Sequence, residues 1–193
     1  MRYARFWWVI AAASISTGVA AAEDNLKGTY AFTATGVCLT APAGFKEDSK
    51  GNLAIPNGDS TLLVTIVAGQ IIYNGDGTAK LTGRFVTTVA PPAPAAISAG
   101  TYSYSFTHTP VSNHSVRATM TPGTYQGAIE SGPAAGQQIT LDVYSNVYQV
   151  SSDGKRLLTA VEKPFLQKIT LSGSPQNPVP RICSLSGSQL LLD

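Results

Sequence analysis

Most of this sequence consists of short segments in which two kinds of side chain alternate, separated by turns rich in Gly, Asn, Asp and Pro. In residues 100–110, aromatic side chains and a His fall on one face, and Thr and Ser side chains fall on the other. Successive side chains of a β-strand point to opposite faces, so this period of two predicts strands. Beyond residue 22 we find no convincing helical stripe, and the pattern therefore predicts an all-β fold.

The alternation predicts about ten short strands. They cover residues 27–39, 60–73, 78–89, 100–110, 115–121, 123–130, 137–144, 146–151, 156–162, 165–171 and 181–186. Two sequences, 74–77 (Asn-Gly-Asp-Gly) and 152–155 (Ser-Asp-Gly-Lys), are typical of hairpin turns. Residues 40–59 and 172–180 are expected to be loops, and the Pro-rich residues 90–99 a stiff connection. Both faces of 60–73 are apolar, which predicts a strand that is covered on both sides.

Strands that follow one another through hairpins favour a single antiparallel up-and-down β-barrel of about 8–10 strands, spanning residues 23–193. Closure into a barrel removes the unpaired edges that an open sheet exposes. A Greek-key β-sandwich is the alternative. A membrane barrel needs an apolar outward band and aromatic girdles, whereas the outward faces expected here are rich in Thr and Ser.

The first twenty-two residues have the features of a secretory signal peptide. Arg2 and Arg5 precede a short apolar run, and the segment ends in three alanines at 20–22. The apolar run is too short to span a bilayer, so no membrane span is expected after this segment is removed. The expected location is the periplasm or the extracellular medium.

Removal of residues 1–22 makes the remaining chain neutral. With Arg2 and Arg5 gone, eleven basic and eleven acidic side chains remain. Nucleic-acid binding is not expected, because no basic patch survives to neutralise phosphates. The sequence leaves the oligomeric state open.

The two cysteines, Cys38 and Cys183, stand near opposite ends of the chain. An exported chain with an even number of cysteines is usually disulfide-bonded, and only one pairing is available here. We therefore predict a Cys38–Cys183 disulfide that ties the first strand to the last, where a barrel would close. A metal site or a catalytic thiol is the alternative.

One aromatic face is a candidate ligand site. It contains Phe85, Tyr102, Tyr104, Phe106 and His108. If this face points into the barrel, it lines an apolar pocket with a few hydroxyl groups, as small-molecule sites tend to be. An ordinary packed core is the alternative.

The sequence carries no recognisable catalytic motif. A nucleophile elbow is missing, because the nearest string, residues 184–188, lacks its first glycine. A metal site formed by His108 and His114 across a hairpin, with Glu130 or Asp142, is an alternative, but the spacing of these residues matches no metal signature. We expect neither a metal nor another cofactor, and we assign no catalytic residue.

Three short blocks carry a resemblance to known proteins. They are residues 26–33, residues 74–84 with their Asn-Gly-Asp-Gly-Thr and Thr-Gly-Arg strings, and residues 180–183. They resemble a group of small exported bacterial proteins of unknown function and, more loosely, calycin-type barrels such as lipocalins and allene oxide cyclases. The lipocalin Gly-x-Trp opening is absent. The resemblance implies a barrel fold and no particular catalytic residue.

Three functions follow as expectations. The first is an exported barrel that binds a small apolar ligand or a partner without catalysis. The second is a shape-steering enzyme of the allene-oxide-cyclase kind, which would need a buried polar group beside the aromatic face. The third is a structural or surface-interaction module, which would need an exposed apolar patch or an unpaired strand edge.

Overall fold

The computed structural model describes residues 26–47, 49, 53–55, 60–91, 93–160, 164–174 and 178–192. The predicted signal peptide, residues 1–22, lies outside them. The described residues form thirteen β-strands and no helix. The strands are β1 (Lys27–Thr40), β2 (Lys46–Glu47), β3 (Leu53–Ala54), β4 (Thr61–Asn74), β5 (Thr78–Val89), β6 (Ile97–Ser112), β7 (Ser115–Met120), β8 (Gln126–Ser131), β9 (Gln138–Leu141), β10 (Ser145–Val150), β11 (Arg156–Ala160), β12 (Phe165–Leu171) and β13 (Val179–Leu191).

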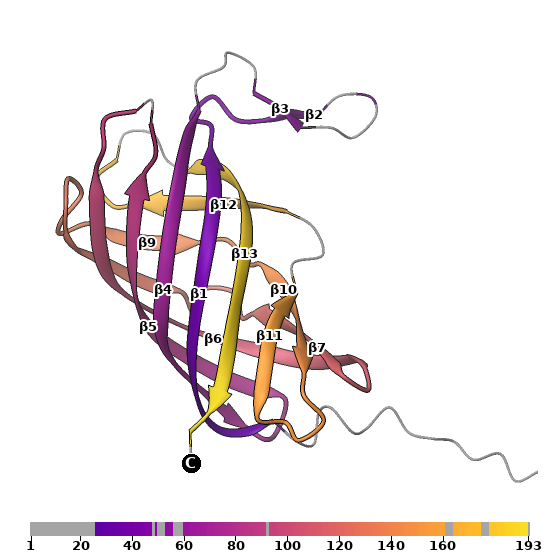
Figure 1. Ribbon diagram of the computed structural model, residues 1–193. Helices are drawn as coiled ribbons and strands as arrows, with labels where there is room; N and C mark the ends of the chain where they lie inside the picture. Colours follow the sequence, from indigo (N-terminus) through magenta and orange to yellow (C-terminus); the bar gives the residue numbers. More distant parts are fainter. Residues whose placement is uncertain are drawn as a thin grey trace, which may run out of the picture.

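Eight strands close into an antiparallel barrel (Figure 1). The ring runs β1-β4-β5-β6-β7-β10-β11-β13, and β13 pairs again with β1. Each strand of the ring therefore has a hydrogen-bonded neighbour on both sides, which removes the edges that an open sheet would expose. The predicted all-β barrel is confirmed and the sandwich is not formed. The closed ring is consistent with a calycin-like barrel.

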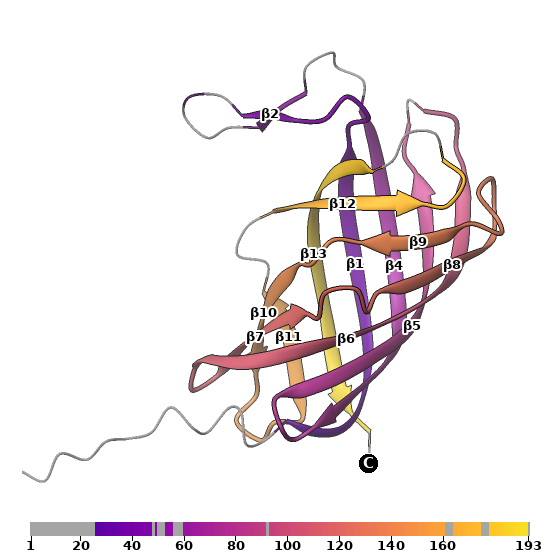
Figure 2. The ribbon, with the colours of Figure 1, turned by 180° about the vertical axis from the view of Figure 1, so that it is seen from behind.

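Two long strands, β6 and β13, each pair along one of their edges with two different strands in succession. The first half of β6 pairs with β8 and its second half with β7. In the same way, β13 pairs with β12 near its start and with β11 near its end. The barrel wall opposite β1 and β4 is therefore built of two stacked parts, with β8, β9 and β12 in one and β7, β10 and β11 in the other (Figure 2).

The two ends of the barrel differ. We call the end with β8, β9 and β12 the rim end; it also contains the start of β4 and the end of β1 (Figure 1). The opposite floor end contains the tight turn at 75–77 between β4 and β5, where Gly75 and Gly77 adopt positive φ. This turn is one of the two predicted hairpins. The other, at 152–155, joins β10 to β11 at the same end.

The floor half of the barrel is packed with side chains. On β4, the inward residues Ile71 and Tyr73 are only 1% and 2% exposed. Leu63, Thr65 and Val67, nearer the rim on the same face, are half-buried. An inward side chain reaches full burial only where others cover it, so this gradient shows that the interior is filled at the floor and open toward the rim.

The prediction that residues 60–73 are covered on both sides is wrong. The outward face of β4 is largely exposed; Ile66, for example, is 58% exposed. Strand pairing places Ile66 beside Val86 of β5, and Ile97 lies two residues nearer the rim than the β6 partner of Val86. The apolar outward residues therefore lie together on the surface, and a closed barrel has no second layer to cover them.

The observed strands differ from the predicted ones in three further details. The expected loop 40–59 contains a small hairpin of β2 and β3, which extends away from the barrel (Figure 1). Strand β6 continues through Pro110, where the pairing with β7 is irregular. Strand β13 continues to Leu191 rather than ending at 186, because its second half pairs with both β1 and β11.

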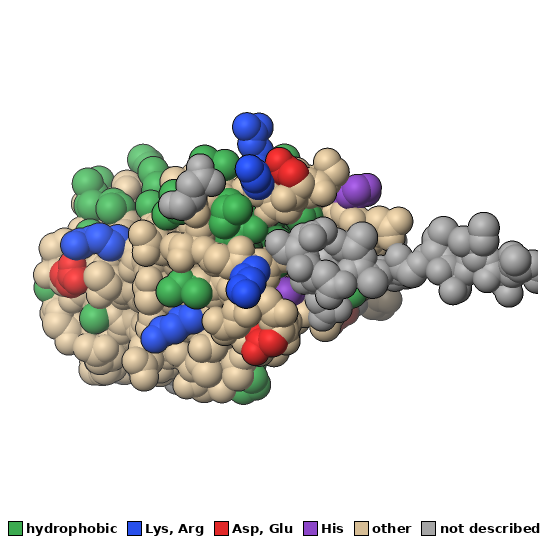
Figure 3. Space-filling view, turned by 90° about the horizontal axis from the view of Figure 1, so that it is seen from below, with side chains coloured by type: hydrophobic (Ala, Val, Ile, Leu, Met, Phe, Trp, Pro, Cys, Tyr) green, Lys and Arg blue, Asp and Glu red, His purple; other side chains and the backbone are tan. Residues whose placement is uncertain are grey.

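The surface is sparsely charged. Viewed from the floor end, Lys, Arg, Asp and Glu side chains are scattered among uncharged atoms, with neither sign gathered into a patch (Figure 3). In the part of the chain that the structure describes, no helix is long and apolar enough to cross a membrane.

Candidate functional site

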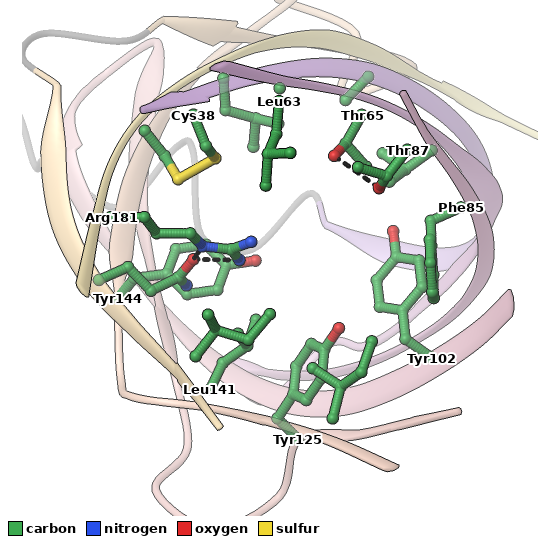
Figure 4. Close-up of a pocket in the computed structure, with 18 of the residues that line it drawn as sticks. Cys38, Leu63, Thr65, Phe85, Thr87, Tyr102, Tyr125, Leu141, Tyr144 and Arg181 are labelled. Carbon is green, nitrogen blue, oxygen red and sulfur yellow. Dashed lines mark hydrogen bonds between the residues drawn. A yellow bond between two sulfur atoms is a disulfide. The ribbon is translucent and has the colours of Figure 1, made fainter. Parts of the chain in front are cut away.

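The rim half of the barrel encloses a cavity of about 320 Å³ (Figure 4). Its volume is at the lower end of the range for small-molecule sites. Side chains from the long strands β1, β4, β5, β6 and β13 form one side of it, and β8, β9 and β12 form the other. Apolar residues make up most of the lining, including Phe32, Leu63, Val67, Phe85, Ile129, Ile139, Leu141 and Ile169.

The structure divides the predicted aromatic face between the cavity and the core. Phe85, Tyr102 and Tyr104 line the cavity. Phe106 and His108 lie further along β6, in the floor, and are only 3% and 1% exposed. The His108 ring packs edge-on against Tyr73 with 5.3 Å between ring centroids. Phe106 and His108 therefore belong to the packed core rather than to the cavity lining.

Three further aromatic residues reach the cavity from the junction between the two stacked parts of the wall. Tyr125 and Tyr144 stand just before β8 and β10, where the chain crosses from one part to the other, and Phe165 begins β12. Their rings form stacks: Tyr144 on Phe165 with centroids 5.5 Å apart, and Tyr125 on Tyr104 with centroids 5.9 Å apart. The sequence analysis placed all three in predicted strands but did not identify their side chains as inward, because each lies at or near the end of its predicted strand, where the alternation is too short to mark the inward face.

The tyrosines of this cluster are held in their neutral form. Burial raises the pKa of Tyr125 to about 12, and the nearby Arg181 partly opposes this rise. Burial also raises the pKa of Tyr102 and Tyr104. The Tyr144 hydroxyl donates a hydrogen bond of 2.7 Å to the Tyr104 hydroxyl. At neutral pH these groups are hydrogen-bonding phenols, and none of them is a ready base.

Two polar pairs lie on the cavity wall, at separate places in Figure 4. The Thr65 and Thr87 hydroxyls are hydrogen-bonded to each other at 2.8 Å, across neighbouring strands. Arg181 of β13 reaches Gln167 of β12, with its Nε donating to Gln167 Oε1 at 2.8 Å and its Nη2 donating to the same oxygen. The sequence did not single out either pair, because Arg181 and Gln167 are fourteen residues apart and only strand pairing brings them together.

Arg181 is the one charged side chain in the cavity lining that the structure describes. Withdrawal of its guanidinium from water lowers the pKa of Arg181, and the Tyr125 and Tyr144 hydroxyls oppose this shift. No carboxylate of the described residues lies within ion-pairing distance of it. Arg181 is half-buried, and a cation partly withdrawn from water without a counter-ion loses hydration that no opposite charge repays.

The other candidate groups lie away from the cavity. Glu130 is exposed and forms an ion pair with Arg84 at 2.7 Å, and Asp142 and His114 are exposed. His108 is buried in the floor and His114 is exposed, so the alternative of two histidines meeting beside a carboxylate is not formed. The described residues contain no group of three or more His, Cys, Asp or Glu side chains that could hold a metal ion.

The predicted Cys38–Cys183 disulfide is confirmed, and both cysteines line the cavity. They are paired residues on β1 and β13, the first and last strands of the barrel. Disulfides of this kind are typical of proteins that mature in an oxidising environment.

Comparison with protein families and with curated proteins finds no match to this chain.

Proposed function

We propose that this protein is an exported binding protein that holds a small, largely apolar ligand in the rim half of its barrel. The observation that carries the proposal is the contrast between the two halves of the interior, since the floor is packed while the rim half encloses a mostly apolar cavity. Packed interiors rarely keep voids much larger than a water molecule. A hollow of about 320 Å³ is therefore a feature that ligand binding would explain.

The lining supports binding over catalysis. Its described residues include no Asp, Glu, His or Lys. The tyrosines that line it have pKa values raised above 10.0, so at neutral pH they are protonated and cannot act as general bases. What the lining offers is apolar surface, aromatic faces and a few hydrogen-bonding groups, which is the usual composition of a small-molecule site.

Export to the periplasm or the extracellular medium is part of the proposal. It is supported by the signal-peptide pattern of residues 1–22 and by the disulfide, which favours an oxidising compartment. The short blocks that resemble small exported bacterial proteins point the same way.

A pair of Trp substitutions tests the proposal with a small neutral apolar fluorophore, 1-aminonaphthalene. Val67 lines the cavity, whereas Ala68, the next residue on β4, points outward and is exposed. We expect the fluorophore to bind the wild-type protein and the Ala68→Trp variant with a blue-shifted emission, and Val67→Trp to bind it at least tenfold more weakly. Equal binding by both variants, or none by the wild type, would remove the basis for a ligand cavity.

A surface-interaction role is a second candidate, favoured by the exposed apolar residues Ile66, Val86 and Ile97. They lie near one another on the outward faces of β4, β5 and β6. Sedimentation of the wild type and of an Ile66→Thr variant tests self-assembly through this surface. We expect an assembly that weakens in the variant, and a monomer at all concentrations would contradict self-assembly.

A further inference from the structure

Resting on the proposed cavity, we infer that the ligand is an amphipathic anion, an apolar body carrying a single carboxylate that binds Arg181. Charge is unequally distributed in the cavity, because one cation faces a lining whose other described residues are uncharged.

The position of Arg181 suits a head-group site. It lies on β13 directly opposite Gln167 of β12, two residues nearer the rim than the disulfide residue Cys183. Its guanidinium extends inward, on the same side of the cavity as Tyr144 (Figure 4). A ligand with its body among the aromatic rings and the apolar side chains would thus bring one end to Arg181.

The hydrogen bonds of Arg181 leave donors available. A guanidinium has five N–H donors and no acceptor. Nε and Nη2 both donate to the single oxygen of Gln167, and Nη1 has no acceptor among the described residues. A carboxylate matches the planar geometry of these donors and can accept two parallel hydrogen bonds.

Gln167 holds the guanidinium in place without neutralising it. It is only 4% exposed, and its amide oxygen orients the charged group while leaving the net positive charge uncompensated. The neighbouring Tyr125 and Tyr144 hydroxyls stay protonated at neutral pH, because burial raises the pKa of both, so neither supplies a negative charge to offset that of Arg181. An anionic ligand would supply the missing counter-ion in a place where water screens the attraction weakly.

The size of the cavity limits the ligand. A volume of 320 Å³ corresponds to roughly ten water molecules at their share of the liquid, so a ligand of about ten to fifteen non-hydrogen atoms would fit. Decanoate falls within this range, and decanol is its neutral counterpart of nearly the same shape. The pair of probes therefore separates the contribution of the charge from that of the apolar chain.

Calorimetric titration of decanoate and decanol into wild-type protein and three variants tests the inference. Arg181→Met removes the cavity cation, while Lys168→Met removes an exposed cation from the outward face of the same strand that carries Gln167. Gln167→Glu nearly preserves shape but gives Arg181 an internal counter-ion. Circular dichroism and thermal melting of each variant establish that it is folded.

We expect the wild type and Lys168→Met to bind decanoate at least tenfold more tightly than decanol. In Arg181→Met and in Gln167→Glu this preference should be lost, with decanol binding retained. If Arg181→Met does not fold, Gln167→Glu alone decides the question. Binding of decanol with no preference for decanoate in the wild type, or a preference that survives in Gln167→Glu, would overturn the carboxylate site and leave the apolar cavity standing. Binding of neither probe to the wild type would overturn both.

Discussion

Cys38 and Cys183 face each other across the pair of strands that closes the barrel, with their Cα atoms 4.1 Å apart. They are separated by 145 positions in the sequence. Their covalent bond thus joins the first and last strands of the closed ring. It also forms part of the cavity wall beside Arg181, so one linkage stabilises the fold and shapes the candidate site.

Loss of this disulfide should destabilise the oxidised protein strongly. The chain-entropy model gives about 5 kcal/mol for a loop of this length, because the bond restricts the unfolded chain. For a domain of this size that corresponds to a melting temperature lower by about 10–20 °C in Cys38→Ala. Thermal unfolding with and without reductant measures the effect. Under reductant, wild type and variant should melt together; a persistent difference would show that the substitution acts through packing instead.

Gly69 should not tolerate even a methyl group. A Cβ at this position would lie 2.1 Å from the Thr82 carbonyl oxygen and 2.9 Å from the ring of Phe32, which packs over it. Gly36, on the neighbouring strand β1, would place its Cβ 3.5 Å from the nearest atom, an ordinary contact. We expect Gly69→Ala to lose about 3 kcal/mol or more of unfolding free energy, as overpacking displaces backbone. Gly36→Ala should remain within about 1 kcal/mol of wild type, since Ala reduces the entropy of the unfolded chain. Urea denaturation compares the two, and similar losses in both would contradict this assignment.

The hydroxyl of Tyr73 should contribute measurably to stability. It donates a buried hydrogen bond of 2.9 Å to Gln189 Oε1 and so links β4 to β13 through the interior. Tyr73→Phe should cost about 1–2 kcal/mol, because Gln189 is left with an unsatisfied buried oxygen. Tyr125→Phe is the control, since the Tyr125 hydroxyl faces the cavity and bonds to no described residue. A free energy of unfolding unchanged in Tyr73→Phe would mean that water or another group replaces the bond.

At alkaline pH, ionisation of the tyrosines should lower the stability of the folded protein. All seven tyrosines among the described residues have a pKa raised by burial above the ordinary 10.0. Below pH 10 they are neutral in both folded and unfolded chains, so they produce no pH dependence there. Above pH 10 the unfolded chain releases these protons first. Stability should therefore fall from pH 10 upward until each folded pKa is reached, which is about 12 for Tyr125 and Tyr148.

Phenolate absorbance recorded together with circular dichroism checks this expectation. We expect the tyrosines to ionise cooperatively as the barrel unfolds. Independent ionisation near pH 10 with the β-sheet signal intact would show that the rings are accessible to water in the folded protein.

The strands themselves were predictable, because an inward and an outward face produce a local alternation that a short segment reveals by itself. The predicted strand 78–89 coincides with β5, and the two hairpin turns are where their Gly residues placed them. Burial on the outward face of β4 was mispredicted because it depends on whether a second layer covers the barrel. The residues 60–73 alone cannot reveal that.

The cavity was predictable only in part. Tyr102 and Tyr104 were found because they stand on a regularly alternating strand, but the same reasoning included Phe106 and His108, which continue that face into the floor. The level along the barrel axis at which the packed core ends and the cavity begins depends on how many side chains from other strands point inward at that level.

The sequence by itself determined the all-β class, the placement of the main strands and the pairing of its two cysteines, since alternation, turn residues and a single available partner are properties of the chain alone. The tertiary structure decided that β6 and β13 each divide between two partners. It also decided that Tyr125 and Tyr144 enter the interior from the junction, and that Arg181 meets Gln167 inside the barrel. These relationships join residues through strand register and closure, which only the complete ring of hydrogen bonds specifies.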